Sequence, residues 1–340
     1  MSGDLLPFPR PSGRQAPTFL ELAQEWLATE ALRLVAPQNE RRHIEHLRVL
    51  WALTEEGLRP RVVKAALAAL LAPQGPLCAA TVNKVRGTGR RVISEALLNE
   101  RWSKPNPFDV VRRFREDRKA HRTLSLAEVR RLLPELRADR RREVLCMLYL
   151  GTRPGELKAL QRVDIDLARG EVLIRRSNGR DRTKTGKPRR LPIPSGLGPA
   201  LKEALAVAPA GCPLIFPSKN GGRQRPDAKL TRMLGAALRR AGLVTGYAYT
   251  CRRCGHRDGR AQLEDLRCPG CGMRLWATGS PVPVRYYDLR HSAATLHREA
   301  GCDPLVIQLA LGHAPETLTD SVYTHLSDEY VRRELDRLRI

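Results

Sequence analysis

The chain has 340 residues, enough for two domains that each bury a hydrophobic core. Its 60 lysines and arginines against 36 aspartates and glutamates give a formal net charge of +24, an excess that attracts a polyanion such as nucleic acid. The longest apolar run, residues 65–72, is far too short to span a bilayer, and the N-terminus lacks the apolar core and cleavage site of a signal peptide. We therefore expect a soluble cytoplasmic protein with no membrane partner.

The first hundred residues are predicted to form a tail followed by a helical domain. Residues 1–16 are rich in Pro, Gly and Ser, which favours a disordered tail. After Thr18, a candidate N-cap, apolar residues recur at spacings of three and four, as on the buried face of a helix. Helices are also expected over residues 38–53, 60–71 and 80–99, which gives a four-helix domain at 17–100 with basic polar faces.

Residues 101–122 are predicted to be a basic linker. Pro105 and Pro107 break the preceding helix, and the segment carries eight lysines and arginines against three acids. Such a segment is either a solvated tether or one that lies along DNA phosphates. Its basic excess favours the second interpretation.

A second, mixed domain is expected over residues 123–340. It begins with a capping box, Ser125 and Glu128, before a helix, and another helix ends near Leu150. Strands at 171–175 and 189–193 are joined by a turn that includes residues 185–188. The fold class is thus mainly α with a small β-sheet, and the later helices are expected at 197–206, 229–241, 292–300 and 304–311.

Five short segments of this domain carry residues that suit chemistry on a phosphodiester. Arginine is the preferred donor to a dianionic transition state, because its planar guanidinium makes several hydrogen bonds. A lysine can protonate a leaving oxygen, and a tyrosine hydroxyl can attack phosphorus. The candidates, each in its own segment, are Arg153 (151–157), Lys184 (183–185), Arg290 (287–291), His313 (311–313) and Tyr323 (322–325).

Each candidate also has an ordinary structural interpretation when it is taken alone. Arg153 could pair with Glu156 and Arg290 with Asp288. Lys184, with Lys187 as a nearby competitor, could lie at a solvated hairpin tip. The other two could be a helix-flanking histidine and a core tyrosine. The five segments in combination favour the chemical interpretation.

This order of segments resembles the tyrosine recombinase (phage integrase) family over most of the chain. The resemblance implies an N-terminal core-binding domain and a catalytic domain that clamp double-stranded DNA. It implies that Arg153, Lys184, Arg290 and His313 surround the scissile phosphate while Tyr323 attacks it, which forms a 3′-phosphotyrosyl link without ATP or a catalytic metal. It further implies a site-specific recombinase or integrase of a mobile element or prophage, associated with the nucleoid. Such an enzyme acts as dimers to tetramers on DNA, in some cases with accessory DNA-bending proteins.

One position departs from the family pattern. The family has a histidine three residues before the second arginine, and here that residue is Tyr287. A phenol with an ordinary pKa of about 10 is a poor base near neutral pH, although it can hydrogen-bond a phosphate. Two alternatives therefore stay open: a catalytically weak or dead DNA-binding regulator with this fold, and a DNA-relaxing enzyme like type IB topoisomerases.

Four of the eight cysteines form two C-x-x-C pairs, each followed by glycine. This spacing is typical of a tetrahedral structural zinc site, and Cys251, Cys254, Cys268 and Cys271 are the predicted ligands. The pairs predict a zinc ribbon at 247–276, inserted in the catalytic domain. The ribbon is either a metal staple for a long loop or an additional contact with DNA or a partner, and DNA is slightly favoured. The arginines available for such a contact are Arg252, Arg253, Arg257 and Arg260.

Overall fold

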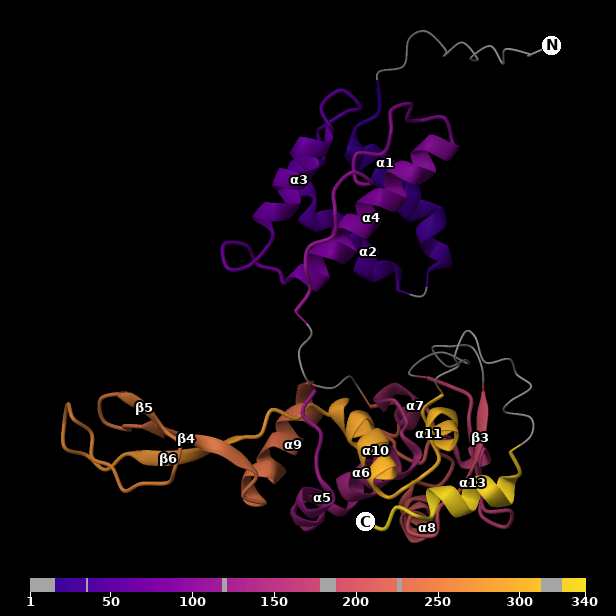
Figure 1. The fold of residues 1–340 in the computed structure, drawn as a ribbon, viewed down its shortest axis with the longest axis vertical. Coiled ribbons are helices and arrows are strands. Elements are labelled where there is room, and N and C mark those ends of the chain that lie inside the picture. The colour runs from indigo at the N-terminus through magenta and orange to yellow at the C-terminus, as the bar shows by residue number, and fades with distance from the viewer. Residues whose placement is uncertain (1–15, 35, 118–120, 178–187, 225–227, 313–325) are drawn as a thin grey trace. The chain divides into compact units, whose positions relative to one another are not determined.

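The computed structural model describes residues 16–34, 36–117, 121–177, 188–224, 228–312 and 326–340. The chain divides into two compact units, Met1–Lys119 and Ala120–Ile340, drawn in Figure 1. Each unit buries a hydrophobic core of its own. Within the described ranges, every helix is too short or too polar to cross a bilayer.

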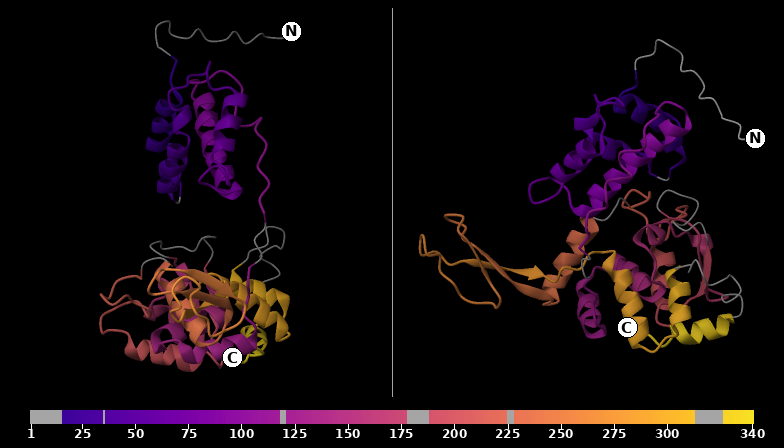
Figure 2. Two further views of the ribbon diagram at one scale, coloured as in Figure 1. Left: turned by 90° about the vertical axis from the view of Figure 1, so that its left-hand side faces the viewer. Right: turned by 45° about the horizontal axis from the view of Figure 1, so that its top comes forward.

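The first unit is helical, and α4 lies at its centre. Thr18 and Glu21 form a capping box at the start of α1, so the predicted N-cap is confirmed. Phe19 and Trp26 of α1 are buried in the unit's core, and α4 packs against α1, α2 and α3 (Figure 2). The helices are α1 (Phe19–Ala28), α2 (Pro37–His46), α3 (Pro60–Ala69) and α4 (Ala79–Leu98), with short 3-10 turns at Glu30–Arg33 and Arg48–Leu50.

Much of the segment predicted as a linker packs onto this first unit. Trp102, Phe108 and Val111 are buried in its core. Phe108 lies so close to α4 that a Cβ atom on Gly89 would be 2.3 Å from its ring. The basic residues between 101 and 115 thus belong to a folded surface, because aromatic and aliphatic side chains between them are buried.

The second unit is built around α6, whose last seven residues include six that are buried. Helices α7, α8 and α10 pack against α6, and a small antiparallel sheet of order β1-β2-β3 completes the unit (Figure 1). The elements are α5 (Leu126–Leu132), α6 (Ala138–Leu150), α7 (Pro154–Lys158), β1 (Ile165–Asp166), β2 (Glu171–Ile174), β3 (Arg189–Pro192), α8 (Gly198–Val207), α9 (Ala228–Arg240), α10 (Asp288–Glu299), α11 (Pro304–Leu311) and α13 (Asp328–Leu335), with short 3-10 turns at Leu133–Glu135 and Arg162–Asp164.

Helix α10 begins four residues earlier than the predicted start at residue 292. Asp288 is the first helical residue, and its carboxylate accepts hydrogen bonds from Arg285. A negative charge in the first turn stabilises a helix N-terminus. Arg290 and His291 therefore lie on the helix itself. At the other end of the unit, Val331 and Leu335 of α13 are buried in the unit's own core.

A second antiparallel sheet, of order β5-β4-β6, extends from the unit beside α9 (Figure 2). Its strands are β4 (Val244–Thr250), β5 (Arg257–Arg260) and β6 (Trp276–Pro281). Its core consists of Tyr249, Leu275 and two cysteines. A core this small cannot fold a module of this size without another source of stability.

Candidate active site

Three of the six candidate residues for phosphate chemistry are described by the structure: Arg153, Tyr287 and Arg290. Lys184, His313 and Tyr323 fall in residues 178–187 and 313–325, outside the described residues. The described part of the site therefore consists of Arg153, Tyr287, Arg290 and the residues that flank Lys184, His313 and Tyr323.

Arg290 joins the ends of two helices. Its guanidinium donates from Nη1 to the Gly151 carbonyl (2.7 Å) and from Nη2 to the Leu311 carbonyl (2.5 Å). Gly151 and Gly312 both have positive φ and end α6 and α11. The negative ends of two helix dipoles thus stabilise a side chain that is only 2% exposed. The alternative pairing of Arg290 with Asp288 is wrong.

Burial and the charge of Arg153 lower the pKa of Arg290 to about 10. The guanidinium is still protonated at neutral pH. A base whose pKa is lowered by a neighbouring cation gains most from an anion placed between the two cations. The space shared by Arg153 and Arg290 therefore suits a phosphate.

Glu156 holds Arg153 in place. Arg153 is the N-cap of α7, and it donates from Nη1 to Glu156 Oε1 (2.7 Å) and from its backbone N–H to Oε2 (3.0 Å). The ion pair considered from the sequence is therefore present. Glu156 also accepts from Arg189 Nη2 at 2.7 Å, so two arginines share one carboxylate. With Arg290, the cluster of three arginines and one carboxylate has a net charge of about +2, which suits a dianionic transition state.

The ionisation of Glu156 is fixed by the same contacts. Burial raises the pKa of this carboxyl, which is 1% exposed, but the charges and hydrogen bonds of Arg189 and Arg153 outweigh burial and hold it below its usual value. Glu156 is therefore negative at neutral pH.

Arg189 is a site residue that the sequence did not single out. It begins β3, on the strand that follows the Lys184 segment, and its Nε donates to the Ala310 carbonyl at 2.9 Å. Its guanidinium lies against Gly312, where a Cβ atom would be 2.8 Å away. Arg189 is buried and Arg190 is exposed, and this strand alternation was the available signal. It was hidden in a run of eight basic residues between 175 and 190.

Tyr287 immediately precedes α10 and is 41% exposed. Its ring meets the His291 ring edge-on, with centroids 5.4 Å apart, and His291 stacks on His121 at 4.2 Å. Within the described residues the Tyr287 hydroxyl has no hydrogen-bond partner. It is thus available to a ligand that approaches Arg290.

Asp288 anchors the start of α10 beneath these rings. The carboxylate is 1% exposed and accepts from the Arg285 backbone (2.8 Å), from Arg285 Nε (3.1 Å) and from His121 Nδ1 (3.2 Å). Burial raises the pKa of Asp288, but the bonds from Arg285 outweigh it and lower the pKa overall. His121 and Asp288 are positioning residues that the sequence did not reveal, because His121 lies 167 residues away along the chain.

The four predicted zinc ligands come together in the β5-β4-β6 module. Their ligand atoms all lie within 4.8 Å of one another, and the Sγ atoms of Cys251 and Cys271 are 3.4 Å apart, as are those of Cys254 and Cys268. A tetrahedral zinc–thiolate centre separates its sulfurs by about 3.8 Å. The cysteines are not joined in disulfides, and the arrangement fits one zinc ion.

The glycine after each C-x-x-C pair has the conformation that this arrangement requires. Gly255 and Gly272 have φ of 74° and 71°, and their backbone N–H groups donate to the carbonyls of Cys251 and Cys268. The turned backbone also directs the Cys254 N–H at the Cys251 sulfur, which lowers the pKa of that thiol, whereas hydrogen bonds to neighbouring sulfurs raise the pKa of Cys254 and of Cys271. Four thiolates this close together need a cation between them, which a zinc ion would supply.

No protein-family model matches the chain. The chain is 27% identical to the tyrosine recombinase XerA of Thermococcus kodakarensis over 222 residues, 64% of this chain and 63% of that protein. It is 30% identical to the tyrosine recombinase XerC of Herpetosiphon aurantiacus over 236 residues, 66% of this chain and 62% of that protein. The matched segment thus spans less than two thirds of either relative.

Two solved structures have similar folds. The Tn1549 transposon integrase in complex with transposon right end DNA matches with a TM-score of 0.65 and 16% identity, over 94% of this chain and 99% of that one. A lambda integrase tetramer bound to a Holliday junction matches with a TM-score of 0.63 and 17% identity, over 89% of this chain and 79% of that one. The fold is that of the tyrosine recombinase catalytic domains, as predicted, and the curated relatives that the chain matches are tyrosine recombinases and integrases.

Proposed function

We propose that the protein is a site-specific DNA recombinase that cleaves and rejoins DNA through a 3′-phosphotyrosyl intermediate. The observation that carries the proposal is the convergence on Arg290 and Glu156. Arg290 donates to the carbonyl of Gly151, which lies two residues before Arg153, and to the carbonyl of Leu311, which lies two residues before His313. Arg189, which follows the Lys184 segment, binds Glu156 and Ala310. Segments adjacent to four of the five candidate residues thus meet at one buried cationic cluster.

In this proposal each side chain has a defined task. Arg153 and Arg290 bind the non-bridging oxygens of the scissile phosphate, and His313 donates a further hydrogen bond. The Tyr323 oxygen attacks phosphorus and its phenolic proton is lost, while Lys184 gives a proton to the departing 5′ oxygen. Attack by the 5′ hydroxyl of a partner strand reverses the step. Glu156 and Arg189 position the cluster, and Tyr287 hydrogen-bonds the phosphate where the family has histidine.

Strand exchange requires more than one copy of the chain on duplex DNA, so we propose dimers that pair into tetramers at a specific site. The lambda integrase structure, a tetramer bound to a Holliday junction, supports this stoichiometry by analogy of fold. The Tn1549 integrase belongs to a transposon, which supports a role in the movement of a mobile element or prophage. Such a role places the protein at the nucleoid, in the cytoplasm.

The cofactor that we propose is one structural zinc ion, held by Cys251, Cys254, Cys268 and Cys271. Zinc would supply the folding energy that the small core of the β5-β4-β6 module lacks. The ion has no task in the phosphate chemistry, because the arginine cluster belongs to a different core.

A second candidate function is a DNA-binding regulator with weak or no cleavage, and the observation in its favour is Tyr287. At this position, three residues before Arg290, the family has a histidine, and a phenol is a poor base near neutral pH. This candidate keeps the DNA partner and the arginine cluster but makes Tyr323 dispensable.

One experiment separates the two. Purified protein is incubated with nicked suicide substrates that carry the DNA ends flanking its own gene, and adducts that survive SDS are measured for wild type and Tyr323→Phe. The recombinase predicts an adduct that vanishes in the variant. Sequence-specific binding without an adduct, across a panel of sites, would favour the regulator.

A further inference from the structure

The zinc module, residues 244–281, has one covered face and one open face. Tyr249 points to the covered face, where it is 1% exposed and its hydroxyl contacts the backbone of Glu264. Its cross-strand neighbours Asp258 and Ala277 share that face by register. The segment around Glu264 thus covers this side of the sheet at Tyr249, where Asp258 is half-buried and Ala277 at the edge is exposed.

The open face carries a row of three cross-strand neighbours, Arg257, Thr250 and Trp276, all exposed. The next row toward the base of the module is Gly259, Ala248 and Thr278, also exposed. The inner row is thus formed by small side chains, whereas the outer row carries Arg257 and Trp276.

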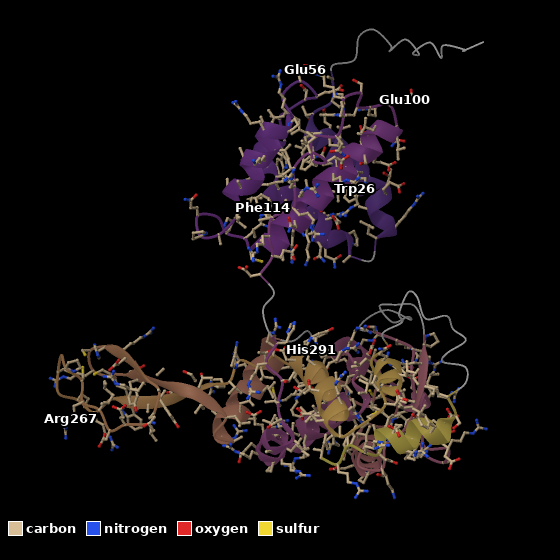
Figure 3. All side chains as sticks on the ribbon, in the orientation of Figure 1. Trp26, Glu56, Glu100, Phe114, Arg267 and His291 are labelled. Carbon is tan, nitrogen blue, oxygen red and sulfur yellow. The ribbon has the colours of Figure 1, made fainter. Side chains whose placement is uncertain are left out.

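Arginine and tryptophan are combined at the outer row of this face. The Arg252 guanidinium lies over the Trp276 ring, 3.7 Å from its centroid, although Trp276 is 54% exposed. The ring holds the guanidinium in one place, which reduces the entropy lost when Arg252 binds an anion. Arg253 follows Arg252 in the first C-x-x-C pair and is exposed. Figure 3 labels Arg267, near the outer end of the same module.

The charges of the module are segregated. It has six arginines and three acids, and all three acids are in ion pairs: Asp258 and Glu264 with Arg260, and Asp265 with Arg274. Among the described residues, no acid pairs with Arg252, Arg253 or Arg257. Zinc with four thiolates would add two negative charges, so the net charge of the module is about +1. Four arginines thus have no acid partner, and one of them, Arg267, donates to the Gly272 carbonyl. Attraction to an anion therefore depends on the position of the other three.

We propose that this open face binds the phosphate backbone of duplex DNA. Its cations are Arg257 in the row of Trp276, Arg252 over the Trp276 ring and the exposed Arg253 that follows Arg252 in the chain. The choice of DNA as the anion rests on the proposed function. Unpaired arginines at an exposed aromatic residue, beside a row of small side chains, suit a phosphate backbone that approaches closely. Trp276 is a positioning residue that orients Arg252. The module is thus a separate DNA contact, distinct from the arginine cluster at Arg290.

The test compares two triple variants of the full-length protein, each of which removes three positive charges from the module. One replaces Arg252, Arg253 and Arg257 with alanine, and the other replaces Arg260, Arg267 and Arg274, whose guanidiniums already bind acids or a backbone carbonyl within the module. Zinc content and the thermal transition are measured first, so that only folded, zinc-loaded variants are compared. Affinity for a duplex recombination site is then measured as a function of salt concentration.

Each phosphate contact contributes about 0.9 to the slope of log affinity against log salt. The first variant should lose roughly two to three units of slope and bind on the order of tenfold more weakly at low salt. The second should keep the wild-type slope. Trp276→Ala should weaken binding by roughly two- to fivefold and Trp276→Phe by less, because only a ring can hold Arg252.

Four results would overturn the inference. Equal losses in both triple variants would mean that only the overall charge matters. Unchanged affinity and slope, with reduced dimer or tetramer assembly on DNA in the first variant, would make the open face a protein contact. Wild-type protein that fails to bind any duplex would remove the proposed function as well, whereas DNA binding and adduct formation that are independent of the three arginines would remove this inference alone.

Discussion

The arginine cluster and the zinc module solve opposite problems within one folded unit. In the cluster, Arg189 and Arg290 are buried close to the half-buried Arg153, and the three cations are stable because helix ends and one carboxylate bind them. In the module, arginines are exposed, and the difficulty is to fold a sheet with almost no core. If the proposed function holds, these are two ways to present positive charge to DNA: in a rigid, desolvated cluster at the reacting phosphate, or in exposed side chains on an outlying sheet.

The two regions should therefore respond differently to perturbation. The cluster depends on the large hydrophobic core around α6, and its loss should affect rate before affinity. The fold of the zinc module would depend on the single proposed ion, and the effect of removing that ion should be confined to the module. Four predictions test this difference.

Removal of the ion should have the largest effect on structure. A structural zinc site contributes on the order of 10 kcal/mol to folding, so Cys268→Ser should leave residues 244–281 without a stable fold while the helical units stay intact. Hydrogen exchange should rise to the level of an unfolded chain in the module and remain slow in α6 and α10. Cys78→Ser, at an exposed single cysteine of the first unit, is the matched control. Protection that persists in the module after metal removal would contradict the zinc-dependent fold.

Arg290→Lys should reduce the rate of adduct formation by roughly 10²- to 10³-fold, the usual effect of removing one donor to a transition state. An ammonium cannot bind the Gly151 and Leu311 carbonyls and a phosphate together with the same geometry. Single-turnover cleavage measures the rate, and site affinity should change little. Arg298→Ala, at an exposed position of the same helix, should be close to wild type, and an equal loss there would assign the effect to helix stability.

Glu156→Gln should destabilise the catalytic unit by about 3 kcal/mol at neutral pH, because two buried arginines lose their counter-charge. The folded-state pKa of Glu156 lies below its unfolded value of about 4.3. Its stabilising contribution is therefore complete above that value and is lost as the pH falls through the folded-state pKa. Urea unfolding at neutral and acidic pH should show that the difference between wild type and variant shrinks in acid. A constant difference would mean that the carboxylate charge is not the cause.

The sequence predicted the fold class, most helix positions, the Thr18 N-cap, the Ser125–Glu128 capping box and the grouping of the four cysteines, because each leaves a short-range pattern. Arg153 and Arg290 were identified by motif, and the structure brings them together. Arg189 was missed because a run of basic residues hid its strand alternation. His121 and Asp288 were missed as a pair because their contact joins residues 167 positions apart. The burial of Trp102, Phe108 and Val111 was missed because the basic charge of their segment masked three spaced apolar residues.

Tyr287→His should have the smallest effect of the four changes, and it tests whether the residue at this position limits the rate of adduct formation. An imidazole at this position titrates near neutral pH and can move a proton, so adduct formation should rise by roughly two- to tenfold near pH 7. The new imidazole would face His291, whose own pKa is lowered by burial and by the neighbouring His121. The rate profile of the variant should therefore gain an inflection slightly below the usual histidine pKa of about 6.5. Tyr287→Phe controls for the hydroxyl alone. An unchanged profile in both variants would show that this position does not take part in proton transfer, and that the cluster together with Lys184 and His313 sets the rate.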